Sequence, residues 1–169
     1  RSKGAADRVA MYLDASLDDN QISAVVQNPN ISLEDEVTPI GDPIDYWEPT
    51  LTPPQGAAVG SLANRTVLEA GGLSVGATDP SGVAVIKTPE DWEKFIELRA
   101  SGWYRGGWDT ITLPTSTLEG GNLDQVTRHE LLHRLVRQLQ DLGALEKIPL
   151  PEMQSILERF DNFQGEATV

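Results

Sequence analysis

The segment from residue 119 to residue 143, EGGNLDQVTRHELLHRLVRQLQDLG, constrains the fold most, because it predicts one long amphipathic helix. Asn122 is a suitable N-cap, Gln125 follows it at the capping-box spacing, and Gly143 is a suitable terminator. The apolar side chains recur at helical spacing and form one stripe, which consists of Leu131, Leu132, Leu135, Val136, Leu139 and Leu142. We therefore expect one face of this helix to pack against a core.

Both histidines of the chain, His129 and His133, lie at the edge of this stripe. Residues four apart on a helix lie one turn above each other on the same face. Two imidazole nitrogens presented in this way can bind one Zn²⁺ at about 2.0–2.1 Å each. Glu130 lies roughly 100° further round the helix, which suits a general base acting on a metal-held water better than a third ligand. The spacing therefore predicts two metal ligands and a general base.

The histidine pair also has a simpler interpretation. A pair of this kind on an amphipathic helix is compatible with an ordinary core-edge pair, and the protein would then be a non-enzymatic acidic interaction module. Because the chain has only two histidines among 169 residues, their placement four apart beside a glutamate is rare by chance. We therefore favour the metal-binding interpretation, and the metal content after purification without a chelator separates the two.

The stretch VTRHELLHRL, from Val126 to Leu135, resembles the active-site helix of the zincin metallopeptidases. The family pattern usually has an uncharged residue where this chain has Arg134. The metzincin branch has a glycine where this chain has Val136 and a histidine where it has Leu139. The resemblance is therefore to the gluzincins, in which a carboxylate from a following helix is the third zinc ligand.

This resemblance implies a small α+β domain with a short mixed sheet, an active-site helix and a C-terminal helix. Strand patterns followed by helix patterns without strict alternation also indicate α+β. The implied activity is that of a zinc endopeptidase, which hydrolyses peptide bonds through a metal-activated water with Glu130 as base and then as acid. Zincins place an edge strand before the active-site helix to pair with the substrate backbone, and DTITL at 109–113 is in that place. A zincin-like fold that binds metal without cleaving peptides is a further alternative.

The third ligand implied by the resemblance must be a carboxylate after the helix. The candidates are Asp141, Glu146, Glu152, Glu158 and Asp161. Asp141 lies two turns beyond His133 on the same helix, roughly 12 Å along the axis, and cannot close the site. Glu146 lies in the connector and would be held loosely, and Glu158 points away from the apolar stripe of the last helix. We predict Glu152, which lies at the edge of that stripe and at a spacing close to that of gluzincins, with Asp161 second.

Local patterns predict the other elements of the chain. They are a helix at 4–17, a short strand at 22–26, an extended Pro-rich connector at 42–56, strands at 65–70 and 82–88, a helix at 88–102, a strand at 110–113 and a last helix at 151–163. The stretch WYRGGW at 103–108 predicts a loop, in which Tyr104 or Arg105 could donate to a developing oxyanion. The favoured interpretation is that Trp103 and Trp108 cover the core.

We expect a single domain over residues 1–169, because a chain of this size needs most of its length for one core. Residues 1–60 would be an N-terminal arm that wraps the core, and residues 61–169 the zincin-like catalytic core. A hinge within the Pro-rich stretch is the alternative.

The net charge of −13 predicts a protein that avoids nucleic acid and anionic membranes and takes a neutral or basic protein or peptide as substrate. The absence of cysteine excludes disulfides and thiolate metal sites. No apolar run is long enough for a membrane span. The chain begins at Arg1, and its size resembles that of a domain of a larger bacterial protein, such as a secreted effector or toxin, which we note as an expectation.

Overall fold

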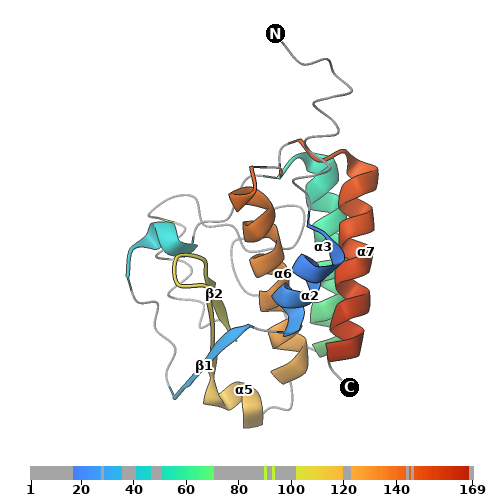
Figure 1. Cartoon of the computed structure of the whole chain (residues 1–169). Helices are drawn as coiled ribbons and strands as arrows, with labels where there is room; N and C mark the ends of the chain where they lie inside the picture. Colours follow the sequence, from blue (N-terminus) through green and yellow to red (C-terminus); the bar gives the residue numbers. More distant parts are fainter. Residues whose placement is uncertain are drawn as a thin grey trace.

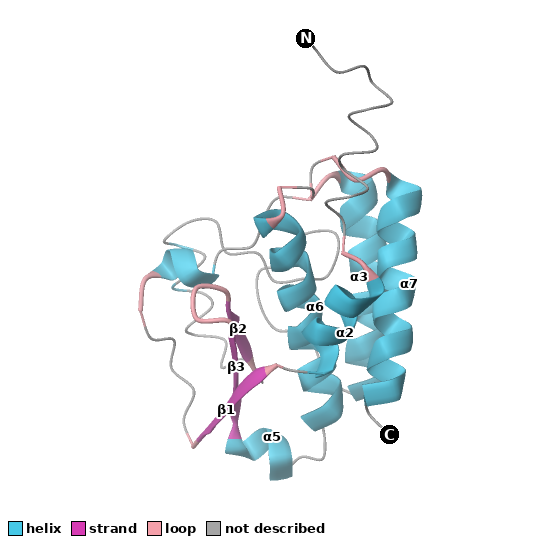
Figure 2. Cartoon of the chain, viewed as in Figure 1, coloured by secondary structure: helices cyan, strands magenta, loops and turns pink. Residues whose placement is uncertain are grey.

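The computed structural model describes residues 17–27, 29–35, 41–46, 51–70, 90, 93, 102–119, 123–143, 145 and 147–167. Within them the fold is α+β, as predicted: a group of helices lies beside a three-stranded mixed sheet (Figures 1 and 2). The large helices are α2 (Asp19–Gln27), α3 (Pro53–Ala70), α6 (Leu123–Asp141) and α7 (Leu150–Ala167). The strands are β1 (Asn30–Glu34), β2 (Trp103–Arg105) and β3 (Thr110–Pro114), and the short elements are the 3-10 helix η1 (Pro43–Tyr46) and α5 (Thr115–Glu119).

The strand order in the sheet is β1-β3-β2, with β1 parallel to β3 and β2 antiparallel to it. The predicted strand at 110–113 is confirmed as β3, but the expectation that it is an edge strand is wrong. It occupies the centre of the sheet because WYRGGW does not form a loop throughout: its first three residues form β2, which turns back onto β3 through 106–109. The edges of the described sheet are therefore β1 and β2.

The predicted strand at 22–26 is wrong, since these residues lie in helix α2. Asp18 and Gln21 form a reciprocal capping box at its start, in which each backbone N–H donates to the other residue's side chain, at 2.8 and 2.9 Å. The buried residues Ile22, Val25 and Val26 lie at helical spacing on one face. The β-branched composition of this segment suggested a strand, and packing of that face against the core overrides the propensity.

The Pro-rich connector and the predicted strand at 65–70 are also wrong, because both overlap helices. The helix α3 begins in the connector and continues through 65–70. Thr52 and Gln55 form a second capping box, with reciprocal hydrogen bonds of 3.2 and 3.3 Å. Pro53 follows the cap at the first helical position, where its lack of an N–H carries no cost. A shorter part of the connector forms η1.

The predicted helices around the histidines and at the C-terminus are confirmed as α6 and α7, and α7 is longer than predicted. The helix α6 is followed by Gly143 in the left-handed conformation, with a φ of 69°. The helices α2 and α3 each pack against both α6 and α7, so α6 and α7 face each other across a common core. Its fully buried side chains are Ile22, Val25, Val59, Ile111, Leu113, Leu132, Leu135, Leu139, Met153, Ile156 and Phe160.

Several sequence predictions lie outside the described residues. These are the helix at 4–17 apart from Leu17, which is described and is not helical, the strand at 82–88, the cap Asn122 and most of the helix at 88–102, of which Glu90 and Glu93 are helical. Of the two tryptophans expected to cover the core, Trp103 is buried, whereas Trp108 is 59% exposed. Among the described helices, none combines the length and the apolar character that crossing a bilayer requires.

Candidate metal centre

The helix α6 brings three potential metal ligands together. One ligand atom each from His129, Glu130 and His133 lies within 4.8 Å of the other two, and this is the one such group of His, Cys, Asp or Glu among the described residues. Glu130 and His133 are buried, with 6% and 7% of their surface exposed, and His129 is partly buried. The structure therefore confirms that the residues singled out from the sequence form a group able to hold a metal ion.

The two imidazole rings converge through their Nε2 atoms, which lie 3.3 Å apart. Two nitrogen ligands at about 2.0–2.1 Å from a tetrahedral Zn²⁺ must stand roughly 3.3–3.4 Å apart, from the bond lengths and the tetrahedral angle. The ring planes make an angle of 77°. The residues present thus fit the ion, although the same distance also suits a hydrogen bond between two neutral rings.

The Nδ1 atom of His129 is buried, and none of the described residues gives it a hydrogen-bond partner. Burial, followed by the charge of His133, lowers the pKa of His129 to about 3. A histidine must be neutral to bind a metal. His129 is therefore in the metal-binding protonation state at neutral pH without having to release a proton.

Glu130 lies against the start of β2. A Cβ atom on Gly102 would stand 3.4 Å from Cγ of Glu130 and 2.9 Å from Cγ1 of Val126. The missing side chain at Gly102 therefore allows β2 and α6 to approach closely beside Glu130. The sequence predicts only that the helix at 88–102 ends at Gly102. Its contact with a residue 28 positions later left no local signal.

The structure does not bring Glu152, the predicted third ligand, to the histidines. It is not a member of the described group. Arg128 of α6 pairs with Asp161 of α7 at 3.4 Å, which shows that Arg128 points to α7. His129 and His133 lie roughly 100° and 140° round α6 from Arg128, so they do not face α7. The prediction assumed that α7 lies directly beside the histidines, whereas α7 packs mainly against α2 and α3.

The other candidate carboxylates are placed elsewhere. Asp161 is engaged by Arg128, and Asp141 lies 3.7 Å from Arg137 on the exposed end of α6. Glu158 is exposed on α7, and Glu146 lies outside the described residues. Glu130 is therefore the carboxylate that the described structure places with the histidine pair.

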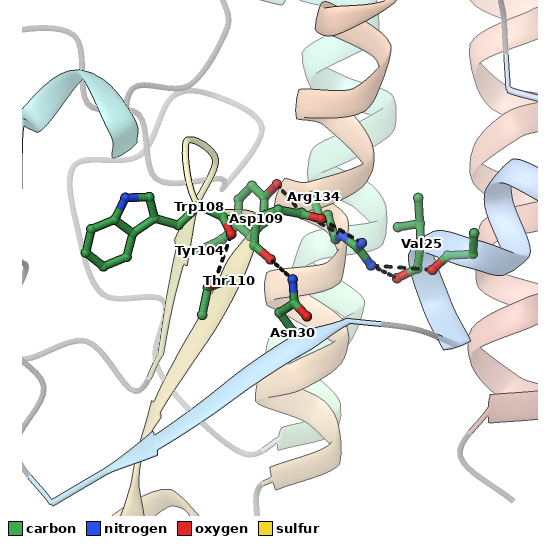
Figure 3. Close-up of polar contacts among 8 residues, drawn as sticks. Val25, Asn30, Tyr104, Trp108, Asp109, Thr110 and Arg134 are labelled. Carbon is green, nitrogen blue, oxygen red and sulfur yellow. Dashed lines mark hydrogen bonds and ion pairs between the residues drawn. The ribbon is translucent and has the colours of Figure 1, made fainter.

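Arg134, the residue that departs from the zincin pattern, is buried and paired with Asp109 (Figure 3). Its Nε and Nη2 atoms donate to the two carboxylate oxygens of Asp109 at 2.8 and 2.9 Å, and Nη1 donates to the carbonyl oxygen of Val25 at 2.9 Å. The hydrogen bond from Arg134 lowers the pKa of Asp109. Sequence reasoning missed this contact, because its partners lie 25 and 109 positions away.

Neither proposed oxyanion donor is free for that role. Tyr104 donates its hydroxyl to Asp109 at 2.9 Å. Arg105 donates from Nε and Nη2 to Asp45 at 3.1 and 2.7 Å, and its guanidinium stacks on Trp108. Both side chains therefore hold the β2–β3 hairpin in place.

Comparison of the chain with protein-family models, with curated proteins and with solved structures found no match.

Proposed function

We propose that the protein binds one Zn²⁺ through His129 and His133 and hydrolyses peptide bonds, with Glu130 as the proton acceptor. The observation that supports this proposal best is the 3.3 Å separation of the two Nε2 atoms beside a buried carboxylate. When bound, zinc would act as a Lewis acid and lower the pKa of a coordinated water towards 7. The acidic surface, with a net charge of −13, favours neutral or basic peptides as substrates.

The roles of the side chains follow from their atoms. His129 and His133 would hold the ion through Nε2, so each Nδ1 would carry the ring proton. The Glu130 carboxylate would accept a proton from the nucleophile and later donate it to the leaving amine nitrogen. A third protein ligand is required for a catalytic site of this type, and a carboxylate that follows α6 in the chain remains the prediction from the resemblance.

A second candidate function is a metal site without peptidase activity. Two observations favour it. Glu130 and His133 are 6% and 7% exposed, which leaves little surface for a substrate. The strand predicted to pair with substrate lies in the centre of the sheet, with both neighbours in place. The two candidates share the zinc site and differ only in turnover.

Metal analysis of protein purified without chelator, with peptidase assays on a mixed peptide library, tests both candidates. We expect about one zinc per chain, in line with a single site. Glu130→Gln should retain zinc and lose peptidase activity by roughly 10²–10⁴-fold, the contribution typical of a general base. His133→Ala should lose both, and Glu158→Gln, which changes an exposed carboxylate on α7, should lose neither.

Each remaining outcome is informative. A folded wild-type protein without zinc would rule out both candidates. Full zinc with no cleavage of any peptide would leave the second candidate. Loss of zinc in Glu130→Gln would make Glu130 a ligand rather than a base.

A further inference from the structure

We infer that Arg134 is a positioning residue for this metal centre. Its bidentate ion pair with Asp109, here called the clasp, fixes the rotation of α6 against the sheet and thereby the positions of His133 and Glu130. The inference rests on the proposed zinc site. It concerns a position where the zincin pattern has an uncharged residue, so the resemblance does not imply it.

The clasp joins α6 to two other parts of the fold. Arg134 donates twice to the carboxylate of Asp109 in the β2–β3 turn, and once each to the carbonyl oxygens of Val25 at 2.9 Å and Ala24 at 3.4 Å (Figure 3). Both carbonyls belong to the last turn of α2, where helix carbonyls lack intrahelical partners and favour a cation. A planar guanidinium can make all of these bonds at once, whereas a lysine ammonium cannot form the bidentate pair.

Asp109 is itself held firmly, so it can serve as a fixed point. It has a φ of 49°, an unusual conformation for a residue other than glycine, and its N–H donates to the Gly106 carbonyl at 3.2 Å. The Tyr104 hydroxyl donates to its carboxylate, and the Asn30 side chain donates to its carbonyl oxygen at 3.0 Å. These contacts tie Asp109 to β2 and β1, on either side of β3.

The position of Arg134 on α6 couples this fixed point to the metal group. Arg134 directly follows His133 and lies one turn after Glu130 on nearly the same face. That face meets the sheet at two places, Glu130 at Gly102 and Arg134 at Asp109. A rotation of α6 by about 10° would move a side-chain end by roughly 1 Å, given the helix radius with side chains. The histidines would keep their mutual distance but shift relative to any ligand or substrate outside α6.

A matched pair of arginine variants separates positioning from general stability. Arg159 of α7 makes a similar anchor to the start of α2, with Nη1 2.9 Å from Asp19 and Nη2 3.3 Å from the Leu17 carbonyl oxygen. Arg134→Gln and Arg159→Gln both remove an arginine that pairs with an aspartate and a backbone carbonyl. Only Arg134 lies on the helix that carries the histidines. The melting temperature, the zinc Kd by chelator competition and the absorption spectrum of the cobalt(II)-substituted protein are measured for each.

We expect Arg134→Gln to raise the zinc Kd at least tenfold and to alter the cobalt(II) spectrum, which reports ligand geometry. Arg159→Gln should lower the melting temperature but leave the zinc Kd within twofold and the spectrum unchanged. Asp109→Asn keeps the shape of the side chain and weakens its hydrogen bonds with Arg134. Its zinc Kd should lie between the wild-type value and the tenfold rise expected for Arg134→Gln, and it tests the inference if Arg134→Gln does not fold. Arg134→Lys should not restore the wild-type Kd.

A wild-type Kd and spectrum in folded Arg134→Gln, or in Asp109→Asn, would overturn the inference while leaving the zinc site intact. Absence of zinc binding by the wild-type protein would instead refute the proposed function, and this inference with it.

Discussion

Gly102, the residue before β2, lies beside Glu130 of α6, and a Cβ on Gly102 would be in van der Waals contact with Cγ of the glutamate at 3.4 Å. The same Cβ would stand 2.8 Å from a methyl of Leu113 and 2.9 Å from one of Val126, which is closer than such atoms pack. A single missing methyl group therefore lets the residue before β2 pack closely against Leu113 and Val126, beside the glutamate proposed as base.

Gly102→Ala should force these neighbours apart. We expect a loss of about 1–3 kcal/mol in the free energy of unfolding, the cost typical of overpacking, and a lower peptidase activity with zinc still bound. Gly106→Ala is the control at the other end of β2, because its Cβ would meet the flexible end of Arg137 at 3.0 Å. Chemical denaturation and zinc analysis measure both effects, and equal stability of the two variants would contradict the prediction.

The low pKa of His129, about 3, predicts acid destabilisation of the metal-free protein. Above its ordinary pKa of about 6.5 the residue is neutral in both folded and unfolded chains. Below that pH the unfolded chain binds a proton at this residue and the folded chain does not. The free energy of unfolding therefore falls by up to about 1.4 kcal/mol per pH unit, down to about pH 3. Denaturation between pH 7 and pH 4 should show a shallower decline for His129→Gln, and parallel curves would argue against burial of a neutral His129.

The raised pKa of Tyr104 predicts a loss of stability at alkaline pH. Burial, the charge of Asp109 and the hydrogen bond to its carboxylate raise the pKa of Tyr104. Its contribution is fully present below the ordinary tyrosine pKa of about 10. As the pH rises further, the unfolded chain releases a proton that the folded chain keeps, and stability is lost. Tyr104→Phe should cost about 1–2 kcal/mol at neutral pH through the lost hydrogen bond, and should remove part of the alkaline decline seen by denaturation between pH 9 and pH 11.

Glu152→Ala should leave the zinc Kd within twofold of wild type, contrary to the prediction from the sequence. The pairing of Arg128 with Asp161 shows which side of α6 faces α7, and the histidines lie on another side. Chelator competition measures the Kd, with Glu158→Ala as the control on the same helix. A large loss of affinity in Glu152→Ala alone would mean that α7 approaches the histidines in the zinc-bound protein.

The elements that the sequence predicted correctly carry strong local signals. The period of the apolar residues and the histidine spacing lie within α6, Gly143 follows it by two residues, and the stripe of α7 is equally local. The two misassigned helices had a usable signal as well. Asp18 with Gln21, and Thr52 with Gln55, have capping-box spacing, and both boxes form. The β-branched residues in α2 favoured a strand, and the prolines at the start of α3 favoured an extended connector.

Contacts between distant segments could not be predicted in this way. The group of His129, Glu130 and His133 was found because one helix turn contains it. Asp109 and Arg134 meet only because the β2–β3 turn lies over α6, and Glu152 is not in the described group because α7 packs mainly against α2 and α3. A single sequence does not show which helices pack against one another. The third metal ligand, which must come from outside α6, therefore could not be predicted from it.

The parallel pairing of β1 with β3 has a consequence for how the chain reaches its fold. The Asn30 side chain contacts a carbonyl oxygen 79 positions later, so the sheet closes a very long loop. Closing such a loop costs entropy, and non-local strand pairing slows folding. During synthesis β1 leaves the ribosome well before its partner exists, with Ile31 and Leu33 on a strand that has no neighbour. These side chains are 46% and 49% exposed even in the finished fold. Fragments that end before residue 110 are therefore expected to aggregate through β1.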